Sequence, residues 1–99
     1  MLNIKTKTEG AALTVILAGR LDTTTAPQLE KLLKEKLDGL EDLTIDMAEL
    51  DYISSAGLRV LLFARKVMDG KGSLRVTHVN ETIMEIFEVT GFADILTIE

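Results

Sequence analysis

The sequence predicts one small α/β domain, with a mixed β-sheet of about five strands and helices packed mainly on one face. Short runs of alternating apolar residues are separated by single amphipathic segments, and only the first two runs are joined by a tight turn. Runs separated by a helix pair in parallel, whereas a tight turn produces an antiparallel hairpin. With 99 residues and 46% hydrophobic content, the chain fits one domain over residues 1–99 with one core.

The first forty residues predict a hairpin followed by a helix. Residues 2–7 alternate apolar and polar side chains, a turn falls at Glu9-Gly10, and residues 12–18 are apolar on both faces, so the second strand is the more interior one. The sequence Thr25-Ala26-Pro27-Gln28 indicates a helix start, because it combines capping-box spacing with a proline in the first turn. Leucines at helical spacing continue this helix to the region of Gly39.

The second half predicts alternating strands and helices. Residues 43–47 form a short third strand, which leads through residues 48–53 into Ser54-Ser55-Ala56-Gly57-Leu58 at the start of a second helix. The remaining predicted elements are that helix to about residue 69, a strand over 74–79, a third helix between an Asn80 cap and a Gly91 stop, and a last short strand over 95–98.

Composition argues against several classes of function. The formal net charge of -5 argues against a nucleic-acid partner, because nucleic-acid-binding proteins collect Lys and Arg to displace counterions. With no cysteine and one histidine, a zinc site is improbable on chemical grounds, and we expect no metal and no cofactor. The N-terminal segment lacks the apolar core of a secretory signal and no apolar run is long enough to span a bilayer, which predicts a cytoplasmic protein without a membrane partner.

The two serines at the start of the second helix are candidate functional residues. In one interpretation Ser54 or Ser55 only caps the helix. In the other, the turn is also an anion site, because free amides and the positive helix end favour a phosphate. A helical projection places Val60, Leu61, Ala64, Val67 and Met68 toward the sheet, and Ser55, Arg59, Leu62 and Lys66 on the opposite side with Phe63 beside them. We interpret the second group as an exposed interaction patch, the alternative being that another element buries it.

Little in the sequence indicates an enzyme. The only histidine, His78, is in phase with the apolar residues of its strand and is predicted to pack there, so Ser55 lacks the base that a hydrolytic nucleophile needs. Asp22, Asp46 and Asp51 are conceivable Mg²⁺ ligands, but Asp46 and Asp51 have ordinary capping roles. No glycine-rich nucleotide-binding fingerprint is present. We therefore predict that the chain is not an enzyme.

Several motifs, in the same order along nearly the whole chain, resemble those of one known family. They are Gly19-Arg20-Leu21-Asp22 after the second strand, Ile45-Asp46-Met47 in the third strand, Ser54-Ser55-Ala56-Gly57-Leu58 before the second helix, and Phe87-Glu88-Val89-Thr90-Gly91-Phe92 at the end of a late helix. The third of these is similar to the family pattern Asp-Ser-Ser/Thr-Gly-Leu. The chain thus resembles the bacterial anti-sigma factor antagonists of the STAS-domain family.

The resemblance implies that the chain works by binding another protein. The unphosphorylated form would bind an anti-sigma factor that is also an ATP-dependent serine kinase, be switched off by phosphorylation, and be reset by a cognate metal-dependent phosphatase. Ser55 is the expected phosphorylation site, with Ser54 as the alternative. The expected partner-binding residues are Asp22, Thr23, Thr24, Ser54, Ser55, Ala56, Gly57, Arg59, Leu62 and Phe63. We expect a monomer or a weak dimer.

Three features depart from the family pattern. The residue before the phosphorylated serine is commonly Asp and is Ser54 here. The residue two beyond the motif glycine is often glycine and is Arg59 here, which either obstructs a closely packed partner or pairs with a phosphoserine one turn away. The sequence stops at Glu99, so this single STAS domain is expected to lack the C-terminal helix that family members usually carry.

Two other functions stay open on the sequence alone. A STAS domain can serve as an unphosphorylated scaffold subunit of a transporter or a signalling complex, in which Ser55 is only a helix cap. The second rival is a weak hydrolase or nucleotide-binding domain, which predicts a turnover that is lost in Ser55→Ala.

Overall fold

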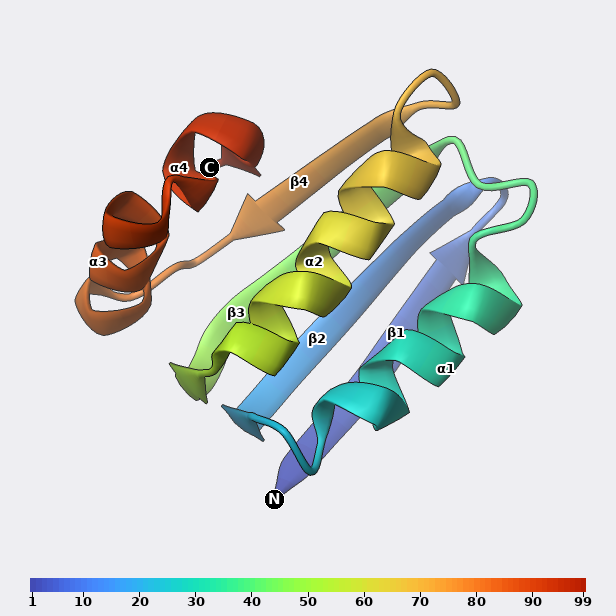
Figure 1. Cartoon of the computed structure of the whole chain (residues 1–99). Coiled ribbons are helices and arrows are strands. Elements are labelled where there is room, and N and C mark those ends of the chain that lie inside the picture. The colour runs from blue at the N-terminus through green and yellow to red at the C-terminus, as the bar shows by residue number, and fades with distance from the viewer.

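The computed structural model describes all 99 residues and contains one five-stranded sheet (Figure 1). In chain order the elements are β1 (Leu2–Glu9), β2 (Ala12–Leu21), α1 (Ala26–Lys36), β3 (Asp42–Ile53), α2 (Ser55–Met68), β4 (Ser73–Thr77), α3 (Glu81–Thr90), α4 (Phe92–Ile95) and β5 (Thr97–Ile98). The strands lie in the order β1-β2-β3-β4-β5; β1 and β2 are antiparallel and all other neighbours are parallel. The predicted mixed sheet with an N-terminal hairpin is confirmed. No helix is long and apolar enough to cross a membrane.

One face of the sheet is buried beneath the helices. Along β2 the side chains of Leu13, Val15 and Leu17 are buried, whereas the residues between them face away and are half-buried. Figure 1 shows α1 and α2 side by side over the sheet, and α3 adds Ile83 and Phe87 to the same core. Burying one such side chain fully contributes roughly 1.5–3 kcal/mol. This core therefore fixes both helices, and the loops that precede them, on the sheet.

The third strand is longer than the sequence predicts. We expected a strand over residues 43–47, but β3 continues to Ile53. The register with β2 shifts twice. Ile16 pairs with Asp46 but Ala18 pairs with Glu49, and Gly19 pairs with Leu50 but Arg20 pairs with Tyr52. Each shift places an extra residue on β3, as in a β-bulge, and this breaks the alternation of buried and exposed residues. The period-2 pattern disappears where the bulges lie, although the strand continues.

The structure contradicts the prediction that His78 packs as a strand residue. β4 ends at Thr77, and His78 is exposed with a φ of 57°. Its Nδ1 lies 3.1 Å from Oδ1 of Asp46. The chain has to leave the strand here to start α3, and a left-handed residue makes that turn. The Asn80 cap of α3 is confirmed, because its Oδ1 accepts from the Ile83 N–H at 2.9 Å.

Candidate partner-binding site

Two loops meet at one edge of the sheet because β2 and β3 are parallel neighbours. Their last residues, Leu21 and Ile53, are paired in register. The N–H of Ser54 donates to the carbonyl oxygen of Leu21 at 2.9 Å, which continues the pairing one residue beyond β3. The loop that precedes α1, residues 22–25, therefore lies beside the turn that precedes α2. The predicted neighbourhood of Asp22 and the two serines follows directly from this pairing.

Ser54 and Ser55 differ sharply in exposure. Ser54 occupies the N-cap position of α2, yet its side chain accepts no capping hydrogen bond. Its Oγ is buried and has no hydrogen-bond partner within the chain. Ser55 is the first residue of α2 and is exposed. The interpretation in which Ser54 acts as a side-chain cap is thus not what the structure shows, and the first amides of α2 have no side-chain acceptor.

Gly57 allows α2 to begin directly against the ends of two strands. It is buried, and a Cβ atom added to it would lie 2.8 Å from Cγ of Leu21 and 2.8 Å from Cγ1 of Ile53. Carbon atoms at that separation overlap strongly, since contact between two carbons is optimal at about 3.5–4.0 Å. The glycine of the Ser-Ala-Gly-Leu sequence is therefore a packing residue that brings the serine turn close to the sheet.

Asp22 organises the loop before α1. Its Oδ1 accepts from the Thr24 hydroxyl at 2.8 Å, from the Thr24 N–H at 3.0 Å and from the Thr25 N–H at 3.2 Å. These hydrogen bonds, that from the Thr24 hydroxyl above all, hold the pKa of the Asp22 carboxyl below its ordinary value.

The predicted capping box over residues 25–28 is not formed, because the Thr25 hydroxyl instead donates to the carbonyl of Arg20 at 2.8 Å.

An arginine and a tyrosine that the sequence analysis did not single out lie at the same edge. The Arg20 guanidinium lies 4.3 Å from the centre of the Tyr52 ring, and its Nε is 3.7 Å from Oδ2 of Asp22. Both residues directly precede the last residue of their strands, and Arg20 and Tyr52 are register partners. The only sequence signal for this contact is that shared position, which becomes visible once the strand ends are known.

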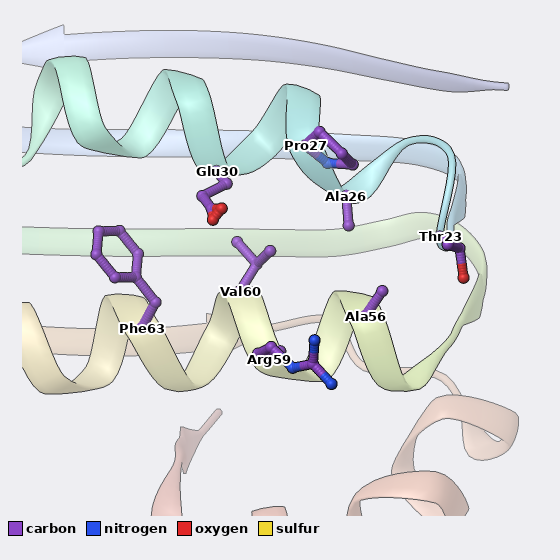
Figure 2. Close-up of a pocket in the computed structure, with 8 residues that line it drawn as sticks. All are labelled: Thr23, Ala26, Pro27, Glu30, Ala56, Arg59, Val60 and Phe63. Carbon is purple, nitrogen blue, oxygen red and sulfur yellow. The ribbon is translucent and has the colours of Figure 1, made fainter.

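A shallow groove of about 300 Å³ runs between α1 and α2 (Figure 2). It is lined by Thr23, Ala26, Pro27, Glu30, Ala56, Arg59, Val60 and Phe63. Thus Thr23, Ala56, Arg59 and Phe63 of the predicted set are brought together here, beside the turn that carries Ser55. The other four lining residues were not predicted, because the approach of α1 to α2 cannot be read from either helix alone.

The predicted apolar patch on α2 is less exposed than the helical projection indicates. Leu62 and Phe63 are both half-buried, while Ser55, Arg59 and Lys66 are exposed as predicted. Phe63 packs partly against the core, and Nζ of Lys34 on α1 lies 5.8 Å from the centre of its ring. The neighbouring helix therefore covers part of this patch, as the alternative interpretation proposed. What remains accessible is a mixed surface of polar, cationic and apolar atoms.

The three aspartates considered as Mg²⁺ ligands do not gather. Asp46 pairs with His78, Asp22 is bound by its own loop, and no cluster of three or more His, Asp or Glu side chains with metal-binding geometry occurs. No hydrogen bond joins His78 to either serine. The geometry thus offers surface for recognition and no assembled catalytic group.

Comparisons with known proteins decide the family. A family model described as "Mlab, STAS domain" matches residues 4–97. The chain belongs to the STAS-domain family. This STAS domain is 38% identical over 84 residues to a protein of Bordetella bronchiseptica named as the anti-sigma factor antagonist BtrV, covering 83% of this chain and 72% of BtrV. It is 31% identical over 97 residues to the anti-sigma-B factor antagonist of Staphylococcus aureus, covering 96% and 90% of the two chains.

Solved structures share the fold of this STAS domain. The unphosphorylated form of the anti-sigma factor antagonist SpoIIAA superposes with a TM-score of 0.78 at 12% identity, covering 98% of this chain and 87% of SpoIIAA. The phosphorylated form of SpoIIAA from Bacillus gives a TM-score of 0.77 at 13% identity, covering 98% and 91%. The predicted family is confirmed, and anti-sigma factor antagonists are regulators rather than enzymes.

Proposed function

We propose that this STAS domain is a phosphorylation-controlled antagonist of an anti-sigma factor. In the unphosphorylated state it binds an anti-sigma factor that is also a serine kinase, through the loop before α1, the first turns of α2 and the mouth of the groove between them. Phosphorylation of Ser55 ends that binding, and a cognate phosphatase restores it. The observation that carries the proposal is the exposed Ser55 at the start of α2, beside the Asp22 loop, in a member of this family.

Ser55 is the better acceptor of the two serines. In the transfer, Oγ of Ser55 forms a bond to the γ-phosphorus of ATP held by the kinase, and the bond from that phosphorus to the β,γ-bridging oxygen breaks. The hydroxyl proton passes to a base of the kinase, and ADP departs. Such a step requires an accessible hydroxyl. Oγ of Ser54 is buried, whereas Ser55 is exposed, so accessibility favours Ser55. ATP and its metal belong to the kinase, and we expect the exchange to occur in the cytoplasm, where ATP is available.

The phosphate acts by charge and desolvation. It adds a charge of about -1.5 to -2 and three acceptor oxygens to the surface that would contact the partner. A helix start tolerates a phosphate, so the domain itself need not change shape. Switching the complex from almost fully formed to almost absent requires a difference of about 5.5 kcal/mol in binding free energy. Repulsion of an acidic partner surface and the cost of desolvating the phosphate act in that direction.

Intact-mass spectrometry after incubation with ATP and cytosolic extract of the host tests this proposal. We expect one added phosphate on the wild-type chain, retained in Ser54→Ala and lost in Ser55→Ala. The matched pair separates the two neighbouring hydroxyls. A phosphate that persists in Ser55→Ala would contradict Ser55 as the acceptor. No phosphate on any of the three chains would contradict the switch and favour the unphosphorylated scaffold.

A further inference from the structure

Arg59 is a cation without a partner, one helical turn after Ser55. It is exposed, and it takes part neither in the three Lys/Arg–carboxylate ion pairs nor in the His78–Asp46 contact. The neighbouring cations are already engaged, since Arg20 pairs with Asp22 and stacks on Tyr52, and Lys34 pairs with Glu30. Among the side chains at this edge of the molecule, Arg59 is therefore the cation free to bind an incoming anion.

The geometry of α2 brings the Arg59 guanidinium toward Ser55. Residues four apart on a helix have Cβ atoms roughly 5–6 Å from each other. Helical side chains also lean toward the N-terminus. Figure 2 shows the Arg59 side chain turned back toward Ala56, in the first turn of α2, at the mouth of the groove. A phosphate attached to Oγ of Ser55 lies within the reach of that side chain.

We propose that Arg59 binds the phosphate on Ser55 and holds it at the mouth of the groove between α1 and α2. The biological relevance of this contact rests on the proposed function, but the contact itself does not depend on any kinase. A guanidinium presents a planar set of donors that matches phosphate oxygens. Before phosphorylation the same guanidinium is free to pair with an acidic residue of the partner.

This contact makes phosphorylation change two features of the surface at once. The free cation is withdrawn from the partner, and the local charge of Arg59 and Ser55 together falls from about +1 to about -0.5 to -1. Arg59, which stands where the family often has glycine, would thus take part in the switch and not merely obstruct the partner. A phosphate held at the groove mouth also covers the apolar lining that a partner side chain would otherwise enter.

Several other charged groups lie on the elements around this position. On the adjoining strand ends and on α1 they are Arg20, Asp22, Asp51, Glu30 and the α-ammonium of Met1, whose carbonyl oxygen accepts from the Arg20 N–H. Arg20 pairs with Asp22 and Glu30 pairs with Lys34, so Asp51 and the Met1 α-ammonium are the unpaired charges of this set. A carboxylate near the phosphate would raise the phosphate pKa, whereas Arg59 lowers it by favouring the dianion. The direction in which the phosphate pKa shifts therefore distinguishes a phosphate bound by Arg59 from one that lies beside a carboxylate.

A ³¹P NMR titration of the full chain with phosphoserine incorporated at position 55 during translation tests the inference. We expect Arg59→Gln to raise the phosphate pKa by about half a pH unit, and Arg59→Lys to restore part of the effect, as for a partly screened ion pair one helical turn apart. Lys66→Gln is the matched control, because Lys66 is exposed on the same helix but lies about 16 Å from Ser55 along its axis. That control should leave the phosphate pKa unchanged.

The result that overturns the inference is an equal phosphate pKa in the Arg59→Gln and Lys66→Gln chains. A larger rise in Arg20→Gln than in Arg59→Gln would also overturn it, since Arg20 would then be the phosphate ligand. This test and the test of the proposed function can fail independently of each other. A phosphate pKa that depends on Arg59, together with no phosphorylation by extract, would remove the switch and leave the Arg59 contact standing.

Discussion

At the scale of single residues, the site depends on two adjacent serines in opposite environments. Ser54 occupies the N-cap position without using its hydroxyl, and its Oγ is buried without a partner. Asn80 does the reverse at the start of α3, where its side chain accepts from the Ile83 N–H and donates to the Leu50 carbonyl. The N-cap side chain thus stabilises α3 through a hydrogen bond, whereas the N-cap side chain of α2 makes no such bond.

Ser54→Ala is predicted to leave stability unchanged or to raise it by up to about 1 kcal/mol, because it removes a buried hydroxyl that lacks a partner. Asn80→Ala is the matched comparison and should lose about 1 kcal/mol or more, since it removes a working cap. Urea unfolding measures both. A loss of about 1 kcal/mol in Ser54→Ala would mean that its hydroxyl caps α2 in solution.

The Asp22 loop predicts a pH dependence with a defined sign. Hydrogen bonds, that from the Thr24 hydroxyl first, lower the pKa of Asp22 in the folded chain. A carboxyl with a lowered folded pKa stabilises the fold above its unfolded pKa of about 3.9, and that contribution is lost as the pH falls through the folded value. The stability difference between wild type and Asp22→Ala should therefore be constant from neutral to mildly acidic pH and shrink below about pH 4. Urea unfolding across pH would contradict this if the difference disappeared near neutrality.

At the scale of elements, the close approach of α2 to β2 and β3 positions the serine turn. Gly57 makes this approach possible, because the space for a Cβ is occupied by Leu21 and Ile53. Both side chains are almost completely buried, so neither can move freely into solvent. The glycine of the motif is therefore explained by packing beneath the exposed Ser55.

Gly57→Ala is predicted to destabilise the domain, although an alanine normally stabilises a helix by up to about 1 kcal/mol relative to glycine. Overpacking of a core costs roughly 1–3 kcal/mol, and that cost should dominate here. Ser55→Ala is the control in the same turn and should change the free energy of unfolding by less than about 0.5 kcal/mol. Equal or greater stability of Gly57→Ala would show that α2 can shift away from the sheet.

At the scale of the whole molecule, the sequence predicts the fold class because most elements carry a regular period. The stripes of α1 and α2 and the alternation in β2 correspond to real burial. The prediction was wrong at His78 and short at β3, where a left-handed turn and two bulges interrupt the period. Local patterns do not contain such irregularities, which depend on the pairing of distant strands.

The candidate site was predictable only in part, for a related reason. The serine turn and Asp22 are visible in the sequence because they follow strand ends and match a family motif. The groove residues on α1, and the Arg20–Tyr52 contact, arise from elements that meet only in the folded chain. The difference in exposure between the two serines is also invisible in the sequence, because it depends on the folded chain around them.

The central claim is that one phosphate on Ser55 abolishes binding to the partner while the domain stays folded. The most direct measurement is the affinity of the purified anti-sigma factor kinase that phosphorylates this chain, for the chain with serine or phosphoserine at position 55. The account predicts a weakening that approaches 10⁴-fold, with the same thermal midpoint for both chains. A weakening of less than about tenfold, which is only about 1.4 kcal/mol, would contradict it.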